Sequence, residues 1–369
     1  MTMLSRRELV GTLLAAVGLP ANGWAQELRA SITEEAGTTL RRAAAQRRII
    51  YGTAVNTMQL HAQDFAAALA REAAILAPEY EMKRAIVERI RGQYDFTGCD
   101  AILAFARDHD MLFRGVPLVW HRRNPDWLED AAHASRDETL ITGFIEKTAG
   151  HFRGRVHSWD VVNEAIAPAD GRADGMRNSF WLDAFGPSYI DIAYHAAREA
   201  DPDALLVYND WGCEAGGPAN DRFRAATLDF LEKALARGVP IQALGLQGHF
   251  AAFGTRVDQL KLRAFLEKIR AMGLSVLVTE HDVDDSGGPS DIATRDRAVA
   301  DASRRFLDVV LDCSATKAVL TWGLSDRYLD SPGWRAELAG YTPRMLPLDR
   351  DLARKPMWRA MAQAFGSRA

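Results

Sequence analysis

Short apolar runs recur along this chain, and longer amphipathic segments separate them. The runs are rich in β-branched residues and have the length of strands, so the pattern predicts strands that alternate with helices. The predicted strands cover residues 49–56, 74–79, 115–121, 156–164, 204–210, 243–249, 274–280 and 318–323. Between them, apolar residues spaced three and four positions apart predict helices that include residues 64–71, 99–108, 189–200, 220–237, 257–272 and 296–313.

This alternation favours an α/β fold, a closed (β/α)₈ TIM barrel with a core of parallel strands. The rival fold, an open doubly wound sheet, has a glycine-rich first turn, and Gly52-Thr53-Ala54 is not such a turn. No low-complexity linker or internal repeat interrupts the pattern, so residues 26–369 are expected to form a single catalytic domain. Residues 26–47 are expected to be a helix packed under the barrel or a partly mobile lead-in.

Composition narrows the class of protein. Of the 369 residues 48% are apolar and 25% are charged, as in an ordinary globular protein. The net charge of −4 is spread without a basic block, so nucleic acid is not an expected partner. Cys99, Cys213 and Cys313 are too few for a disulfide scaffold, and either one bridge or three buried thiols would fit. The sequence has no HExxH metal motif and implies no organic cofactor.

The first 25 residues have the features of a signal peptide. Ser5-Arg6-Arg7 precedes a mildly apolar run and a small-residue site that ends at Ala25. The paired arginines resemble the twin-arginine export signal, and a Sec signal is the alternative. The apolar run is about half the length that spans a bilayer, so a stable membrane anchor is disfavoured. We therefore expect a periplasmic or secreted protein.

Polar residues crowd at the ends of the predicted strands, where barrel enzymes carry their catalytic groups. The strand ends carry Asn163-Glu164, Asn209-Asp210, Gln247-Gly248-His249, Thr279-Glu280-His281-Asp282, and Trp322 with Asp326 nearby. One carboxylate at a strand end often caps the following helix. Five such ends around one rim are hard to explain as caps.

Two glutamates on different strands can flank a glycosidic bond, one as proton donor and the other as nucleophile. The ring of His249 can donate to Glu280 and be oriented by Asp282, which would keep Glu280 ionised. Asn163 can hold a sugar 2-hydroxyl. Indole faces stack on pyranose rings, and Trp120, Trp211, Trp322 and Trp334 fall near strand ends, although large aromatics also fill barrel rims.

Several motifs resemble the successive signatures of glycoside hydrolase family 10, the endo-1,4-β-xylanase family, and the similarity covers nearly all of the chain after the signal peptide. They are Trp159-Asp-Val-Val-Asn-Glu164, Leu246-Gln-Gly-His249, Val278-Thr-Glu280-His-Asp282 and Thr321-Trp-Gly-Leu-Ser-Asp326, with supporting matches at Tyr51-Gly-Thr-Ala-Val-Asn56, Glu79, Met82-Lys83 and Leu118-Val-Trp-His121.

The resemblance implies a retaining hydrolase of β-1,4-xylan, with Glu164 as acid/base and Glu280 as nucleophile supported by His249 and Asp282. It assigns sugar binding to Lys83, Trp120, His121, Asn163, Asn209, Gln247, Trp322 and Trp334. The two catalytic carboxyl groups are expected about 5–5.5 Å apart, the spacing of retaining enzymes. A polysaccharide is the implied partner, and the chain is expected to be a monomer.

The sequence departs from the family on the glycone side of the cleft. Tyr80 follows Glu79 where asparagine is usual, Val116 replaces a histidine, and Arg122-Arg123 replace Ser-Gln. The arginines either face solvent or contact an acidic glycan, since arginine suits bidentate binding of a carboxylate. Two alternatives to a xylanase are the same mechanism on another, possibly acidic, β-glycan, and a non-catalytic carbohydrate-binding barrel. Retention of both glutamates disfavours the second alternative.

Overall fold

The computed structural model describes residues 37–329 and 341–366, and the part from Leu40 onward forms one compact unit. The expected signal peptide and Trp334 lie outside the described residues. None of the helices within the described ranges is long and apolar enough to cross a membrane.

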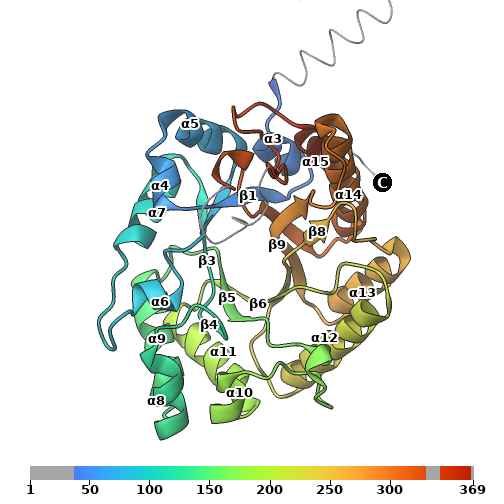
Figure 1. The fold of residues 1–369 in the computed structure, drawn as a ribbon. Coiled ribbons are helices and arrows are strands. Elements are labelled where there is room, and N and C mark those ends of the chain that lie inside the picture. Colours follow the sequence, from blue (N-terminus) through green and yellow to red (C-terminus); the bar gives the residue numbers. More distant parts are fainter. Residues whose placement is uncertain (1–36, 330–340, 367–369) are drawn as a thin grey trace, which may run out of the picture. The chain divides into compact units, whose positions relative to one another are not determined.

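The described chain closes into a parallel barrel, which confirms the predicted fold (Figure 1). Its main strands are β1 (Ile50–Val55), β2 (Ile75–Pro78), β3 (Leu112–Gly115), β5 (Ser158–Asn163), β6 (Leu205–Asp210), β7 (Ala243–Leu246), β9 (Ser275–Asp284) and β10 (Thr316–Thr321). They pair in this order, and β10 closes the ring by pairing with both β9 and β1. Almost every strand residue is buried, as expected where helices cover the outside and side chains fill the inside.

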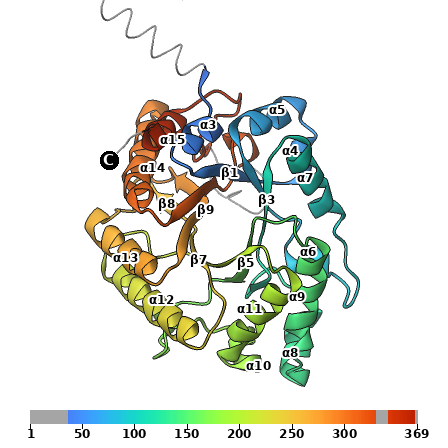
Figure 2. The ribbon, with the colours of Figure 1, turned by 180° about the vertical axis from the view of Figure 1, so that it is seen from behind.

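Helices surround this ring on the outside (Figures 1 and 2). They are α3 (Leu40–Gln46), α4 (Thr57–Leu60), α5 (Gln63–Glu72), α6 (Arg84–Val87), α7 (Thr97–Asp108), α8 (Trp127–Ser135), α9 (Thr139–His151), α10 (Phe180–Phe185), α11 (Ser188–Ala200), α12 (Pro218–Ala236), α13 (Gln259–Ala271), α14 (Ile292–Asp312) and α15 (Pro356–Gly366). Short 3₁₀ turns occupy Pro168–Asp170 and Asp326–Tyr328. Each helix named from the sequence is present, with ends that differ by a few residues.

Two of the predicted strands are interrupted, and in both places the backbone explains why. The predicted strand 115–121 is instead β3 followed, after Pro117, by the short β4 (Val119–Trp120), because proline has no N–H for the ladder. The predicted strand 243–249 breaks at Gly248, which has a φ of 75°, and β8 (His249–Ala251) then pairs with the extended end of β9. Both breaks lie at the mouth of the barrel and redirect side chains there.

The lead-in expected at residues 26–47 contains a helix, α3, which buries Leu40 and Ala44. Figures 1 and 2 both show α3 beside α15, which in turn packs against α14. Glu72 secures this region because its carboxylate accepts hydrogen bonds from the Leu40 N–H (2.9 Å) and the Trp358 indole (3.0 Å). Cys99, Cys213 and Cys313 are unbridged and buried, so the structure supports three buried thiols rather than a disulfide bridge.

Beneath the barrel mouth lies a buried ion pair between Arg114 of β3 and Asp160 of β5. Both side chains are almost inaccessible to solvent, and Arg114 also donates to the hydroxyl of Ser158 (3.1 Å). Burial raises the pKa of Asp160 to about 6, although the charge of Arg114 opposes this shift. Such a pair fixes the relative positions of two strands, one of which leads directly to Glu164.

Candidate active site

Residues from many strand ends converge on one pocket of about 690 Å³ at the mouth of the barrel. It is lined by Glu79, Tyr80, Lys83, Trp120, Arg122, Arg123, Asn163, Glu164, Gln247, His249, Glu280 and Trp322. Most of the residues predicted to form the site are in this set. Its volume falls in the range of about 300–1,000 Å³ that is usual for ligand pockets.

Glu164 follows β5 directly and is held in an unusual backbone conformation. Its φ is 58°, in the left-handed region that non-glycine residues seldom adopt. The backbone N–H of Glu164 donates to the Asn209 carbonyl (2.9 Å), and its carbonyl accepts from Nε of Arg177 (2.6 Å). The side chain is nearly buried, and its Oε1 accepts from the Gln247 amide (3.0 Å). Backbone and carboxylate are thus both fixed.

Glu280 on β9 has a different set of partners. Its Oε1 accepts from the Asn209 amide at 2.8 Å, and its Oε2 lies 3.4 Å from Nε2 of His249. The hydroxyl of Thr279 donates to the amide oxygen of Asn209 (2.7 Å), which orients this amide toward Glu280. Burial alone would raise the pKa of Glu280, but the hydrogen bond and charge of His249, with help from Lys83 and Asn209, hold it below its usual value.

His249 is linked to a second carboxylate, as the sequence predicted. Its Nδ1 lies 3.0 Å from Oδ1 of the buried Asp282. Burial lowers the pKa of His249, yet the adjacent charges of Asp282 and Glu280 outweigh it and raise the pKa well above the usual value. The imidazole is therefore a cation at neutral pH, with a carboxylate at each nitrogen.

Lys83 lies close to the indole rings of both Trp120 and Trp322, two of the tryptophans that the sequence marked for stacking on sugars. Its Nζ is 5.0 Å from the ring centroid of Trp120 and 5.3 Å from that of Trp322, within the range of cation–π contacts. Burial lowers its pKa, while the charges of Glu280, Asp160 and Glu164 act in the opposite direction. Glu79 lines the same wall, and its carboxylate accepts from the Asn56 amide (2.9 Å).

The remaining predicted residues lie around this pocket rather than on its surface. Asn209 is fully buried behind Glu280, with its amide 2.9 Å from that of Asn163. His121 places Nε2 3.9 Å from Oε2 of Glu164, and burial together with nearby arginines lowers its pKa to about 4, so the ring is neutral. Trp211 is half exposed and is not among the lining residues.

Three further residues that were named from the sequence do not line the pocket. Asp210 is buried and accepts from the N–H groups of Ile166 and Trp211. Asp326 pairs with Lys355 (2.7 Å) and does not line the pocket. Val116 is also buried and, unlike Tyr80 and Arg123, is not among the residues that line the pocket.

Two positioning residues were missed. Arg177, thirteen residues after Glu164, holds the carbonyl of that glutamate through its guanidinium. Glu214 accepts from the N–H of Gly248 (2.9 Å), at the turn that precedes His249. No motif marks either position, because each contact depends on how a loop folds back toward the barrel.

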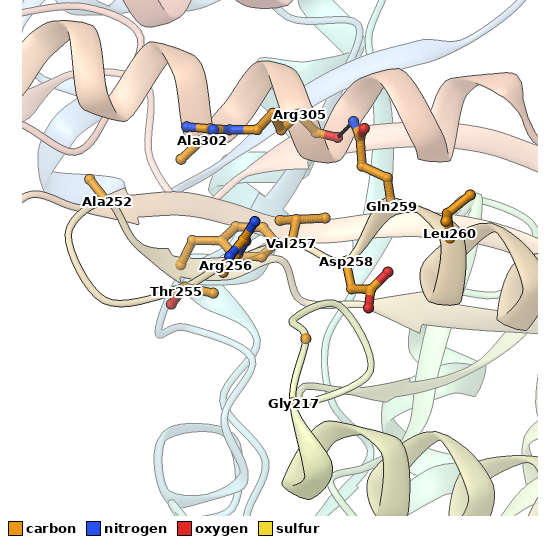
Figure 3. A pocket seen from close by; sticks show the side chains of 12 residues that line it. Gly217, Ala252, Thr255, Arg256, Val257, Asp258, Gln259, Leu260, Ala302 and Arg305 are labelled. Atoms are coloured by element: carbon orange, nitrogen blue, oxygen red, sulfur yellow. Dashed lines mark hydrogen bonds between the residues drawn. The ribbon is translucent and has the colours of Figure 1, made fainter.

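A second hollow, of about 870 Å³, is larger but has fewer carboxylates in its lining (Figure 3). It lies between the loop before α13 and helix α14, where the Gln259 amide donates to the Arg305 carbonyl (2.8 Å). Its lining includes one carboxylate, Asp258, which caps α13 by accepting from the Lys261 N–H. None of the predicted site residues line this hollow.

A parallel barrel whose mouth holds two glutamates from different strands, beside indole rings, defines a glycoside hydrolase. Comparison with known proteins gives the family. The chain belongs to glycosyl hydrolase family 10, whose family model matches residues 39–364. This family is a retaining one.

Individual relatives agree with this assignment. Endo-1,4-beta-xylanase B of Thermotoga neapolitana is 33% identical over 295 residues, which cover 79% of this chain and 81% of that protein. The structure of native xylanase 10B from Thermotoga maritima is 30% identical, with a TM-score of 0.78 over 89% of this chain and 98% of that one. Xylanase 10B from Thermotoga petrophila, solved in complex with xylobiose, matches with the same identity and TM-score over 97% of its chain.

Proposed function

We propose that this protein is an endo-acting β-1,4-xylanase that works by double displacement. Glu280 attacks the anomeric carbon while Glu164 protonates the leaving oxygen, and Glu164 then activates the water that releases the sugar. The observation that carries the proposal is the contrast between the two glutamates in one pocket. Glu280 has a cationic partner in His249. The side chains near the Glu164 carboxyl group, which are Gln247, Asn163 and His121, are neutral.

This contrast assigns the two roles. A nucleophile must be ionised to attack, and the contacts of Glu280 hold its pKa low. The Asn209 amide and the His249 ring leave one lone pair of each Glu280 oxygen for the substrate. Glu164 has one oxygen held by Gln247, while its other oxygen, Oε2, makes no hydrogen bond with a described residue. That oxygen can carry the proton that the leaving group takes.

The substrate class rests on the relatives and on the pocket together. The relatives named above are xylanases, and one of them was solved with xylobiose. In this chain Trp120 and Trp322 supply ring faces, and Lys83 and Gln247 supply donors, to the same pocket. Ring faces with a few placed donors are the usual means of binding a neutral sugar.

Two variants and one spectrum test the mechanism. Glu280→Ala should abolish turnover of xylan, while Glu164→Ala should spare substrates with good leaving groups in the first step, because they need little protonation. Proton NMR of the first product should show the β-anomer, which retention requires. Appearance of the α-anomer first would mean inversion and would overturn the mechanism.

We also propose that the chain is exported and loses about its first 25 residues. The support is the sequence pattern around Arg6 and Arg7, followed by the apolar run. Arg6→Lys with Arg7→Lys should trap precursor in the cytoplasm if the twin-arginine route is used. Normal export of this variant would favour the Sec route instead.

A further inference from the structure

Two arginines that follow β4 line the same pocket as the two glutamates. Arg122 and Arg123 are both exposed and both belong to the pocket wall that also contains Lys83 and Tyr80. This wall therefore adds two guanidinium groups beside the space where a glycan chain would lie. Neutral sugars offer no formal charge to match them.

The turn that carries the arginines is rigidly attached to the barrel. The Asn124 amide donates to the Trp120 carbonyl (2.8 Å), and the Ala85 N–H donates to the Arg123 carbonyl (2.9 Å). Arg123 has a φ of 55°, a left-handed conformation that glycine or asparagine would adopt with less strain. These contacts fix the backbone positions from which both side chains extend.

Neither guanidinium is paired with a carboxylate in the part of the chain that the structure describes. Within residues 37–329 and 341–366, no carboxylate lies within ion-pair distance of Arg122 or Arg123. Arg122 donates from Nε to Nε2 of His121 (3.2 Å), a neutral ring, and the Arg123 side chain makes no hydrogen bond with a described residue. By contrast, the buried Arg84 nearby is paired with Glu88 at 2.8 Å. The planar donor forks of Arg122 and Arg123 thus remain available to a ligand.

We propose that Arg122 and Arg123 bind the carboxylate of a uronic-acid substituent on the β-1,4-linked backbone that this enzyme cleaves. A carboxylate matches the guanidinium fork through two parallel charge-assisted hydrogen bonds, which a hydroxyl group cannot reproduce. The inference rests on the proposed xylanase function and adds a preference to it: acid-substituted chains are cleaved better than neutral ones. The contact is partly exposed, so added salt weakens it.

A matched pair of substrates isolates this carboxylate. One is glucuronoxylan, and the other is the same polymer after chemical reduction of its uronic acids to neutral sugars. The readout is the ratio of kcat/KM on the two polymers, measured at ionic strengths of about 0.02 M and about 0.3 M. For the parent we expect a ratio above one at low salt, by about tenfold, that falls as salt is added.

The decisive variant is Arg122→Gln with Arg123→Gln, which should bring the ratio close to one and remove its salt dependence. The matched control is Arg136→Gln, because Arg136 is also exposed and left-handed, with a φ of 50°, but lies outside the pocket. The control should keep the parent ratio. Since Arg122 contacts His121, overall rates of the double variant are not used, and the ratio alone decides.

The possible outcomes distinguish a failure of the carboxylate site from a failure of the proposed xylanase function. If the parent cleaves both polymers equally well, or if the double variant keeps the preference, the carboxylate site is refuted and the xylanase assignment stands. If the parent cleaves neither polymer, the xylanase function and the carboxylate site both fail.

Discussion

Arg177 offers a sharp test of how Glu164 is held. Arg177→Met keeps an unbranched side chain that reaches about as far as Nε of arginine, but it removes the guanidinium, whose Nε lies 2.6 Å from the Glu164 carbonyl and whose Nη2 lies 3.4 Å from that of Ile166. A hydrogen bond from a charged donor contributes about 1.5–3 kcal/mol, and it opposes the strain of a left-handed glutamate, which costs about 1–3 kcal/mol. If this energy keeps the carboxyl group in place, its loss should lower the rate of proton donation by about ten- to a hundredfold.

The assay compares two substrates that differ in their need for protonation. A xylo-oligosaccharide has a poor leaving group and should lose the full factor in kcat/KM, which reports the first chemical step. An aryl xylobioside with an acidic phenol should lose little. Arg172→Met is the control, because Arg172 lies on the same loop but pairs with the exposed Asp174. Equal losses on both substrates, or no loss on either, would refute this account of Arg177.

Two further predictions concern charge. His249→Gln removes the cation that lowers the pKa of Glu280, so Glu280 should take up a proton at higher pH. The acid limb of the profile of kcat/KM against pH should therefore move to higher pH. If this limb does not move, His249 does not control the pKa of Glu280. Arg114→Met leaves the buried Asp160 without its partner, so the free energy of unfolding should fall by about 3–5 kcal/mol. Urea titrations measure this loss. A loss below about 1 kcal/mol would show that water reaches the pair.

The sequence predicted the barrel because each buried strand is a short apolar run rich in β-branched residues. Each helix is a longer segment with apolar residues three and four positions apart. Interruptions by single residues were harder to foresee. Pro117 and Gly248 each split a run that is apolar by composition, since a missing N–H or a left-handed φ acts on the backbone and leaves the hydrophobic pattern unchanged.

The central part of the site could be predicted because it lies on strand ends, whose positions follow from the fold. His249, with Asp282 on one side and Glu280 on the other, is the clearest case. Arg177 could not be foreseen, because its contact with Glu164 depends on the path of the intervening loop. For Arg122 and Arg123 the sequence left two positions open, solvent or cleft, and the structure places both on the wall of the pocket.

The central claim is that Glu280 forms a covalent bond with the sugar during turnover. A 2-deoxy-2-fluoro xylobioside with a good leaving group tests it directly. The fluorine slows both formation and release of the glycosyl-enzyme, whereas the good leaving group speeds formation alone, so the covalent intermediate accumulates. After incubation and proteolysis, mass spectrometry should find one fluoro-xylobiosyl group, attached to the peptide that contains Glu280. Labelling of Glu164, or no labelling while the enzyme remains active on xylan, would contradict the account.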